Sequence, residues 1–475
     1  MKAKKSEDFS EWYSEVVQEA GLAGYAPIKG FVYLPPYGYE LWELIRSHFD
    51  ERFRKSNHRN AFLPILIPES LLRKEAEHFK GFTPEVFWVT TSGDDQLSER
   101  LAVRPTSETL FYATFGKSIK SWRELPVLVN FWNSALRAEI KSTKPFVRTS
   151  EFLWQEGHTL HATKEEADEE VMRMLNIYKA VIEEKLAIPV IAGYKSELEK
   201  FVGALYTTTL EAVMPDGKIL QMATSHNLGQ NFTIPFDVRY LGPDGQMHYA
   251  WSTSWGVSWR LIGAVIMVHG DDRGLVLPPE VAPIQVVVIP IFYSDAEKES
   301  VIEKCREIVL RLQNAGIRTH LDDRTDYTPG WKFNEWELKG VPVRVEIGPR
   351  DLSEGKVTLF RRDELKRARV DDRVLVDAVR ELLSEVQKNL FRRARETLNS
   401  MVSEAKSMEE FTRILEIRGG FVKSTYCGSN DCELRIKDLT GATVRAIPFE
   451  REPLLSNCIA CGKEGKVTAY FGRAY

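Results

Sequence analysis

The spacing of apolar and polar residues predicts a first region that runs to about residue 282. Residues 6–20 and 39–58 carry apolar side chains close to the helical period, and residues 61–68 form a short apolar run typical of a buried strand. A long helical stretch lies at 164–186. The other strand-like runs are 85–90, 127–132, 136–140, 151–161 and several pieces between 188 and 255. Because strands rarely alternate with helices here, we expect a mainly antiparallel α+β sheet.

Beyond a proline-rich linker at 277–283, the pattern changes to an alternation of strands and helices. A continuous apolar strand is expected at 284–290 and another at 341–347. The elements expected between them are a helix at 296–315, a short strand at 318–321 and a helix around 333–339. This alternation predicts a small α/β domain with a largely parallel sheet.

A long charged helix around 370–396 leads into a third region, which holds four of the five cysteines. The chain length supports a division into several domains, since 475 residues suggest about two to four of them. We therefore expect domains at 1–282, 283–382 and 383–475, of which the last is a small α+β domain.

Composition and charge narrow the class of protein only a little. The chain is 43% hydrophobic and 28% charged with a net charge of -4, which is ordinary for a soluble globular protein. No apolar run reaches the ~18 residues of a membrane span, and the N-terminus lacks the apolar stretch of a secretory signal. We therefore expect a cytoplasmic protein. Residues 339–369 are locally basic, with nine Lys or Arg against five Asp or Glu, as is typical of a nucleic-acid contact.

The cysteines of the third region form two closely spaced pairs, Cys427 with Cys432 and Cys458 with Cys461. In a cytoplasmic chain such pairs indicate a metal site rather than disulfides. Four thiolates suit a tetrahedral Zn²⁺ and leave no position for water, so the site should be structural. The alternative is four unrelated buried cysteines. Cys305 lies in an expected helix and is interpreted as a core residue.

The first candidate for chemistry is a polar hairpin. Arg137 and Glu139 are two residues apart on an expected strand and so share a face, as do Glu156 and His158 on the next strand. A basic loop with Phe146 lies between them. Such a hairpin suits an anionic, ring-bearing ligand such as ATP, with arginine on phosphate and the phenylalanine against the base. The alternative is an ion pair on a solvated face.

A second candidate is Arg260, which precedes the uncharged run 261–268. A buried guanidinium at the start of an apolar helix is costly, and the helix dipole disfavours a cation there. A bound polyphosphate would resolve both problems. The alternative is a salt bridge to a carboxylate elsewhere in the chain.

Two further polar stretches remain ambiguous on the residues alone. Thr106 is a good N-cap for the helix that begins with Ser107 and Glu108, and capping is the favoured interpretation over contact with a substrate ammonium. Residues 221–231 hold a dense set of amides and hydroxyls with His226, which is unusual for a core strand.

Taken in order, these stretches resemble the signature motifs of class II aminoacyl-tRNA synthetases. Residues 39–68 are similar to motif 1, which forms the dimer, Arg137 with Glu139 to motif 2, and Arg260 to the end of motif 3. More narrowly, the chain resembles prolyl-tRNA synthetases of the archaeal and eukaryotic type. The stretches that carry this likeness are RPTSE at 104–108, ATSH at 223–226, VHGDDRGLVLPP at 268–279, PGWKFNEWELKGVP at 329–342 and the cysteine pairs.

The resemblance implies a fold and a set of site residues. It implies an antiparallel-sheet class II catalytic domain, an α/β anticodon-binding domain and a zinc-binding C-terminal domain. Arg137 would contact both the ATP α-phosphate and the proline carboxylate. The other ATP-binding residues would be Glu139, Phe146, Val147, Gln221, Thr224, Ser258 and Arg260. The proline-binding residues would be Thr106, Glu108 and His226, with Trp154, Glu156 and Ser254 as further candidates. Zinc would bind Cys427, Cys432, Cys458 and Cys461.

The same resemblance implies ATP-dependent activation of L-proline with Mg²⁺, transfer to tRNA(Pro) and a homodimer. We expect the anticodon readers to be Lys332, Trp336, Glu337, Arg344 and Arg350. The 123 residues between Arg137 and Arg260 leave no room for a large inserted editing domain. One departure is Trp259, because the family usually has a hydroxyl residue before the motif 3 arginine. The rival interpretations are a class II synthetase for another amino acid and a non-catalytic tRNA-binding relative.

Overall fold

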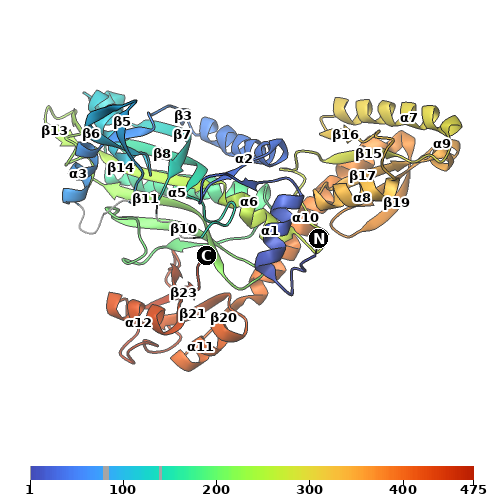
Figure 1. The fold of residues 1–475 in the computed structure, drawn as a ribbon. Coiled ribbons are helices and arrows are strands. Elements are labelled where there is room, and N and C mark those ends of the chain that lie inside the picture. Colours follow the sequence, from blue (N-terminus) through green and yellow to red (C-terminus); the bar gives the residue numbers. More distant parts are fainter. Residues whose placement is uncertain (1, 79–84, 139–141) are drawn as a thin grey trace.

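The computed structural model describes residues 2–78, 85–138 and 142–475. Figure 1 shows three regions: a large sheet with its helices, a smaller α/β region joined to it by the long helix α10, and a C-terminal region packed below the large sheet. Among the described residues, no helix has the length and apolar character needed to cross a membrane.

A seven-stranded sheet forms the centre of the first region. Its strands, in spatial order, are β3 (Arg59–Asn60), β7 (Val127–Leu136), β8 (Glu151–His161), β14 (Trp251–Ser258), β11 (Ile219–Gly229), β10 (Tyr206–Val213) and β9 (Ile191–Tyr194). All its pairings are antiparallel except that of β3 with β7. The predicted antiparallel α+β sheet is therefore confirmed.

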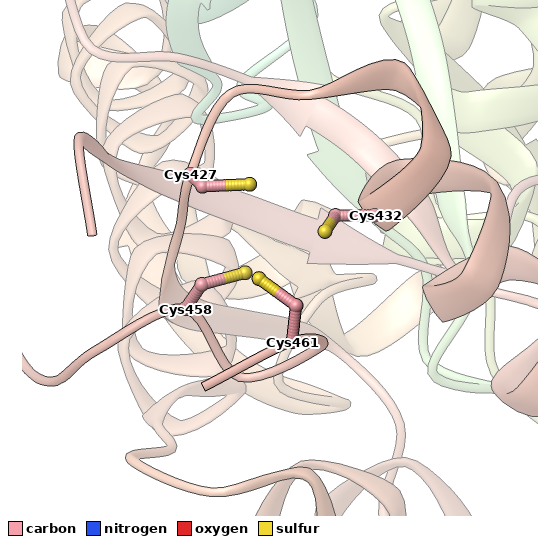
Figure 2. Close-up of side chains that lie close together, drawn as sticks. All are labelled: Cys427, Cys432, Cys458 and Cys461. Carbon is pink, nitrogen blue, oxygen red and sulfur yellow. The ribbon is translucent and has the colours of Figure 1, made fainter. Parts of the chain in front are cut away.

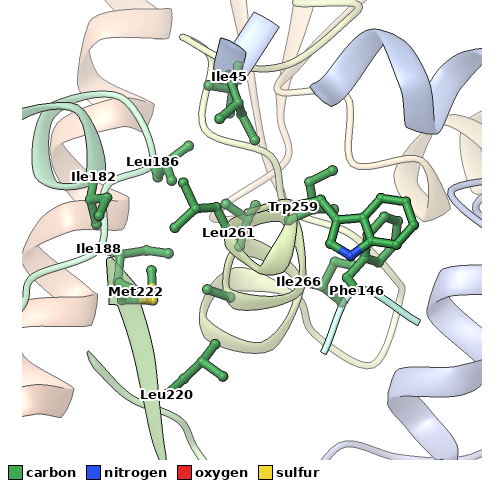
Figure 3. Packing of buried hydrophobic residues seen from close by; sticks show 14 of the residues in the cluster. Ile45, Phe146, Ile182, Leu186, Ile188, Leu220, Met222, Trp259, Leu261 and Ile266 are labelled. Atoms are coloured by element: carbon green, nitrogen blue, oxygen red, sulfur yellow. The ribbon is translucent and has the colours of Figure 1, made fainter. Parts of the chain in front are cut away.

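Helices cover this sheet and form the main core. They are α1 (Phe9–Glu19), α2 (Pro36–Lys55), α5 (Lys164–Glu184) and α6 (Arg260–His269). Thr163 caps the start of helix α5, because its hydroxyl accepts a hydrogen bond from the Glu166 amide. Between its end residues Arg260 and His269, helix α6 is apolar all round, which is typical of a helix buried on every side. Figure 3 shows Leu261 and Ile266 of α6 among side chains of the core cluster.

A smaller sheet adjoins this core, and it corrects one prediction. Its order is β4 (Leu66–Pro68), β6 (Asp95–Val103) and β5 (Trp88–Ser92). The predicted buried strand at 61–68 is wrong for most of its length, because only its end is a strand and Phe62 is 82% exposed. The remaining short elements are β1 (Gly24–Tyr25), β2 (Val32–Tyr33), α3 (Glu69–His78), α4 (Glu108–Phe111), η1 (Tyr112–Gly116), η2 (Trp122–Glu124), β12 (Arg239–Leu241) and β13 (Met247–Tyr249).

The second region is a five-stranded mixed sheet. Its order is β16 (Thr319–Leu321), β15 (Val286–Pro290), β17 (Val343–Ile347), β18 (Lys356–Arg361) and β19 (Lys366–Asp371). The first three strands are parallel as predicted, but β18 and β19 add an antiparallel hairpin, so the sheet is not largely parallel. Its helices are α7 (Asp295–Asn314), α8 (Pro329–Leu338) and α9 (Pro349–Glu354).

Helix α10 (Leu375–Ser400) follows the short turn η3 (Asp372–Val374) and leads into the third region. The predicted boundary at 382 therefore falls inside a continuous helix. The third region has a four-stranded sheet in the order β20 (Val402–Glu404), β21 (Phe421–Tyr426), β23 (Val467–Gly472) and β22 (Thr443–Ala446). Helices α11 (Met408–Ile417) and α12 (Asn430–Thr440) complete it.

Candidate functional site

A cavity of about 590 Å³ opens over the strands β8, β14 and β11. Thirteen of the fourteen residues expected to bind ATP or proline line it. They are Thr106, Glu108, Arg137, Phe146, Val147, Trp154, Glu156, Gln221, Thr224, His226, Ser254, Ser258 and Arg260. The fourteenth, Glu139, lies outside the described residues.

Strand register brings together residues that are far apart in the sequence. His158, Ser254 and His226 occupy directly paired positions on β8, β14 and β11. The next row on the same face pairs Glu156 with Gly256 and Gly256 with Thr224. Side chains two residues apart on a strand share a face, so both rows face the cavity.

One end of the cavity is acidic, and Glu156 is its buried centre. The carboxylate accepts hydrogen bonds from the Ser107 amide and the Asn133 side chain, both at 3.0 Å. Burial alone would raise the pKa of the Glu156 carboxyl, but its hydrogen bonds and the charge of His158 outweigh burial and lower that pKa. Glu156 is therefore an ionised carboxylate whose oxygens are already engaged by the protein.

Glu108 lies beside Glu156 with fewer partners. Its carboxylate accepts a hydrogen bond from the hydroxyl of Thr106, which also donates to Glu156 at 3.2 Å. Capping by Thr106 is therefore wrong, because the residue before α4 is Ser107 and no side chain caps that helix. The hydroxyl of Thr106 instead orients two carboxylates at the cavity wall.

Two histidines of the cavity have opposite charge preferences. Burial, with the positive charges of His158 and Lys195, lowers the pKa of His226 to about 3, so its ring is neutral at pH 7. Its Nδ1 lies 2.9 Å from the hydroxyl of Thr207. Burial would also lower the pKa of His158, but the carboxylates of Glu156 and Glu108 raise it instead.

The other end of the cavity is basic. Burial and the nearby charge of Arg137 lower the pKa of Arg260 to about 10, which still leaves the guanidinium charged at pH 7. Arg137 packs over the ring of Phe152 at 5.2 Å. Neither arginine forms an ion pair with a carboxylate in the described part of the chain, so the alternative of a salt bridge for Arg260 is not supported there.

Trp259 lies in the core at the edge of this basic end. Its indole is buried and packs edge-on against Phe146, with ring centroids 5.6 Å apart, as Figure 3 shows. Its amide donates to the carbonyl of Leu153 at 2.9 Å, which holds the chain in place as it enters α6. The departure at Trp259 is thus mainly a packing feature, although the side chain also reaches the cavity lining.

The structure differs from the prediction at the start of the polar loop. Strand β7 ends at Leu136, so Arg137 lies just beyond the strand and not within it. Its amide donates to the carbonyl of Ser150 at 2.7 Å, which continues the pairing with the opposite side of the hairpin. Arg137 therefore still projects from the hairpin, although the strand alternation used to predict it does not apply.

Several cavity residues were not predicted as ligands. They include Arg148, Lys195, Glu199, Phe201 and Thr207, along with His158, which was noted only for sharing a face with Glu156. Arg148 was detectable because it follows the basic loop. The segment 195–201 gave no signal, since its mixture of charged and apolar residues is typical of any surface segment.

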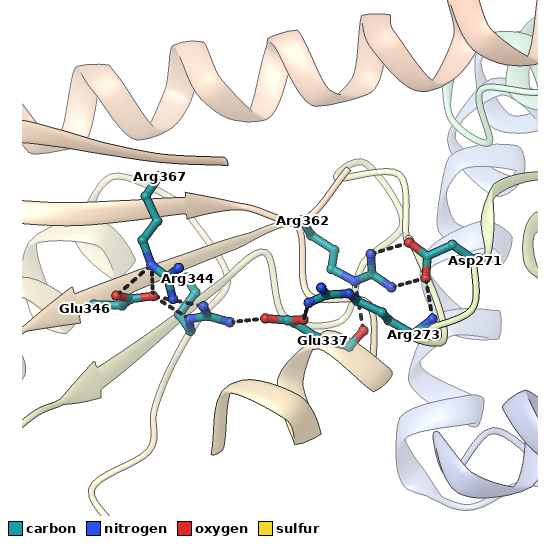
Figure 4. Close-up of polar contacts among 7 residues, drawn as sticks. All are labelled: Asp271, Arg273, Glu337, Arg344, Glu346, Arg362 and Arg367. Atoms are coloured by element: carbon teal, nitrogen blue, oxygen red, sulfur yellow. Dashed lines mark hydrogen bonds and ion pairs between the residues drawn. The ribbon is translucent and has the colours of Figure 1, made fainter. Parts of the chain in front are cut away.

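The predicted anticodon readers lie in the second region, and four of the five are buried. Lys332 and Trp336 both hydrogen-bond to Asp322, at 3.0 Å and 2.9 Å. Glu337 and Arg344 belong to the ion-pair network of Figure 4 and are 3.0 Å apart. Arg350 alone among the five is exposed. An anticodon base could reach these four buried side chains only at their small exposed surface, or after the hydrogen bonds and ion pairs around them open.

The network of Figure 4 also joins the second region to the first. Arg362 makes a two-pronged contact with Asp271, at 2.7 and 2.6 Å, and donates to the carbonyl oxygen of Glu337 at 2.9 Å. Arg273 contacts Glu337 at 2.7 Å. Every arginine drawn there has a carboxylate partner, whereas Arg137 and Arg260 of the cavity have none within the part of the chain that the structure describes.

The four cysteines of the third region gather at one point, and Figure 2 shows their sulfurs facing one another. Their Sγ atoms all lie within 4.8 Å of each other. Burial would raise the pKa of Cys458, but three backbone amides lower it to about 7. Because a thiolate is the form that binds metal, this cluster fits a tetrahedral cation such as Zn²⁺. Cys305, in contrast, is buried in α7 as expected for a core residue.

Comparisons with known protein families match three segments of the chain. Residues 87–269 match the family described as "tRNA synthetase class II core domain (G, H, P, S and T)". Residues 285–382 match "Anticodon binding domain", and residues 408–475 match "Prolyl-tRNA synthetase, C-terminal".

Similar proteins cover the chain almost completely. It is 54% identical to a proline–tRNA ligase of Cenarchaeum symbiosum over 473 residues, which is 100% of this chain and 99% of that protein. It is 52% identical to a proline–tRNA ligase of Alkaliphilus oremlandii, with 98% and 96% covered. It is 51% identical to "Proline--tRNA ligase 2" of Clostridioides difficile, with 99% and 97% covered.

Proposed function

Because this chain belongs to the proline–tRNA ligases of the class II aminoacyl-tRNA synthetases, we propose that its cavity joins L-proline to ATP and then passes the prolyl group to tRNA(Pro). The observation that carries the proposal is the polarity of the cavity. Glu108 lies at one end, and Arg137 and Arg260, which have no carboxylate partner among the described residues, lie at the other. A ligand pair with an ammonium at one end and phosphates at the other matches this polarity.

The acidic end binds proline. Glu108 accepts a hydrogen bond from the secondary ammonium, and Thr106 holds that carboxylate in place. Neutral His226 and Ser254 contribute polar contacts without adding charge, and Trp154 covers the pyrrolidine ring. Glu156 is already saturated by the protein, so it acts mainly by positioning Thr106 and His158.

The basic end binds ATP. Arg137 lies between the two subsites and contacts both the α-phosphate and the proline carboxylate, while Arg260 contacts the outer phosphates. Phe146 packs on the adenine ring. The remaining ATP-binding residues are Glu139, Val147, Gln221, Thr224 and Ser258.

The reaction then needs positioning and charge stabilisation but no covalent protein nucleophile. A proline carboxylate oxygen attacks the α-phosphorus of ATP, the bond to the β-phosphate oxygen breaks, and pyrophosphate leaves. A hydroxyl of the terminal tRNA ribose then attacks the prolyl carbonyl carbon, and AMP leaves. Arg137 and Arg260 offset the negative charge that develops at phosphorus, which is often the largest catalytic contribution. Class II synthetases use Mg²⁺ with ATP, and the ion adds to this effect.

The other two regions support the catalytic region, which we define as residues 1–282. Residues 283–382 bind the anticodon, with Lys332, Trp336, Glu337, Arg344 and Arg350 as candidate readers. Residues 383–475 form the C-terminal region, in which Cys427, Cys432, Cys458 and Cys461 hold a structural Zn²⁺.

The assembly and type of the enzyme follow from the same likeness. We infer a homodimer through residues 39–68, because Phe62 and Ile65 are exposed apolar side chains in that segment. We assign the chain to the archaeal and eukaryotic type on the basis of its C-terminal region. As a separate proposal, we place it in the cytoplasm. The described residues between Arg137 and Arg260 form ordinary strands and one helix, α5, without an inserted domain. Selectivity against similarly sized amino acids then rests on the pocket or on a separate protein, because one methylene in an apolar pocket is worth only about 1–3 kcal/mol.

ATP–pyrophosphate exchange tests this function most simply. The purified chain is assayed with Mg²⁺, labelled pyrophosphate and each of the twenty amino acids in turn. Exchange that depends on proline supports the proposal. Exchange that depends on another amino acid would mean a synthetase of different specificity, and binding of tRNA without any exchange would mean a non-catalytic relative.

A further inference from the structure

The C-terminal region docks on the edge of the sheet that carries the cavity. Tyr194, at the end of β9, and Ile447, just beyond β22, exchange two backbone hydrogen bonds of 2.7 and 2.8 Å. Gly193 allows this approach, because a Cβ at that position would lie 2.4 Å from the carbonyl oxygen of Ile447. The side chain of Arg445 in β22 thereby enters the catalytic region.

Strand pairing is irregular at Arg445 and beside Glu211. The register of β22 against β23 shifts between Val444 and Ala446, which leaves Arg445 as the extra residue. The register of β10 against β11 shifts between Leu210 and Glu211, where the extra residue is Met222 of β11, so Glu211 lies next to this bulge on the facing strand. A bulge re-aims the side chain that it displaces, and bulges are frequent beside active sites. Arg445 and Glu211 meet where the two bulges adjoin.

Glu211 is fully buried and binds cations from both regions. One of its oxygens accepts hydrogen bonds from Nη2 and Nε of Arg445, at 2.9 and 3.2 Å. The other accepts from Nζ of Lys195 and from the Thr209 hydroxyl, both at 2.6 Å. A buried carboxylate that is fully hydrogen-bonded holds its partners rigidly, because breaking one contact leaves a charge uncompensated.

The segment that starts at Lys195 forms the cavity wall beside His226. Lys195, Glu199 and Phe201 all line the cavity. The Lys195 amide donates to the carbonyl of Thr207 at 2.9 Å, and the ring of Phe201 lies 4.9 Å from that of His226. Arg445 also lies 3.5 Å from the carboxylate of Glu199. Arg445 is therefore linked to this wall in two ways. It contacts Glu199 directly, and it binds Glu211, which in turn accepts a hydrogen bond from Lys195.

We propose that Arg445 of the C-terminal region is a positioning residue for the proline end of the cavity, which it shapes by fixing Glu211, Lys195 and Glu199. The C-terminal region then contributes to amino-acid binding and not only to the stability of the chain. The proposal rests on the proposed function, since it takes proline as the ligand beside His226.

The test measures proline-dependent exchange and calorimetric proline binding for the full chain and five variants: Arg445→Ala, Arg445→Lys, Glu211→Gln, Arg445→Ala/Glu211→Gln and Arg395→Ala. Arg445→Ala should raise the KM and Kd for proline by about tenfold or more with a smaller change in kcat, since a ~1 Å misplacement of positioning groups can cost up to ~10²-fold. Arg445→Lys keeps a charge for Glu211 and should recover part of the affinity. The double variant Arg445→Ala/Glu211→Gln should bind proline no worse than the weaker of its two single variants, because both substitutions act on the same contact.

Arg395→Ala is the matched control, because Arg395 pairs with Glu183 across the same two regions at 3.1 Å but does not line the cavity. It should leave the KM for proline unchanged. The proposal is overturned if folded Arg445→Ala binds proline like the parent, if Arg445→Lys recovers nothing, or if the two substitutions are additive. A parent protein that does not respond to proline would instead overturn the proposed function, so the two failures are distinguishable.

Discussion

Two groups of arginines in this chain have opposite environments. At the junction of the first two regions, Arg344 and Arg362 each contact carboxylates within 3.0 Å. In the cavity, Arg137 and Arg260 have no carboxylate partner among the residues that the structure describes. Arg260 is nevertheless the first residue of the apolar helix α6, where burial and the nearby charge of Arg137 lower its pKa.

This difference separates structural arginines from those kept for a ligand. A guanidinium withdrawn from water is unfavourable unless an anion compensates it. In the junction, the protein supplies that anion from its own side chains. In the cavity, no carboxylate among the described residues forms an ion pair with Arg137 or Arg260, and a polyphosphate is a ligand that would supply the missing partner. The four clustered cysteines follow the same rule with the opposite sign, since gathered thiolates need a cation.

The largest effect is expected at the cysteine cluster. Cys461→Ser should remove the bound metal and unfold the C-terminal region, because structural zinc sites contribute about 10–16 kcal/mol of apparent binding energy in small peptides. Elemental analysis of the parent should give about one zinc per chain, as expected for a four-cysteine site. Cys305→Ala is the matched control and should keep its zinc. Retention of full zinc content by Cys461→Ser would contradict the claim that the four clustered thiolates are kept for a cation.

The next effect tests the paired arginines. Arg344→Ala leaves Glu337 and Glu346 buried without this partner, so the free energy of unfolding should fall by about 3–5 kcal/mol. Urea unfolding followed by circular dichroism measures this change. Arg350→Ala, in the same region but at an exposed pair, should change stability by less than about 1 kcal/mol. Equal losses for the two variants would contradict the structural role of Arg344.

Arg137, which has no carboxylate partner among the described residues, should show the reverse: its replacement should affect activity and not stability. Arg137→Ala should lower the rate of proline-dependent exchange by about 10²–10³-fold, because it removes a charge that stabilises the transition state. Its free energy of unfolding should stay the same or rise, since no buried anion loses its partner. A fall in stability comparable to that of Arg344→Ala would mean that Arg137 is structural.

The smallest effect concerns His161, a buried histidine that is neutral at pH 7 in the folded chain. Burial, only partly offset by Glu170, lowers the pKa of His161 to about 4. The unfolded chain therefore binds a proton between pH 6.5 and 4 that the folded chain does not, so this residue's contribution to stability is full above pH 6.5 and is lost as pH falls. The loss should reach at most about 3 kcal/mol. His161→Gln should flatten the dependence of unfolding free energy on pH in this range, and an unchanged slope would exclude His161 as its source.

Much of the fold could be predicted from the sequence because its elements are periodic and locally capped. Strand β8 and helix α6 appear where apolar and polar spacing placed them. The hairpin of β18 and β19 was missed because its strands are rich in charged residues, which carry no strand pattern. The segment 61–68 was mistaken for a buried strand because exposed and buried apolar runs look the same in one sequence.

The cavity could be predicted only in part. Arg260 was identifiable because a cation before an apolar helix conflicts with local rules, and such conflicts indicate function. Thr106 was misread as a cap because one of its two partners is far away in the sequence. Besides Glu108, it contacts Glu156, which is 50 residues away. Lys195 and Arg445 gave no local signal, since their roles depend on strand register and on the docking of two regions.

The most direct test of the central claim is calorimetric titration of ATP into the parent, Arg260→Ala and Arg362→Ala. All three should be folded at the temperature of the titration. If unpaired arginines bind the phosphates, the parent and Arg362→Ala will bind ATP alike, and Arg260→Ala will lose at least about tenfold in affinity, as expected for a charged hydrogen bond of about 1.5–3 kcal/mol. Equal affinity in all three would contradict the account.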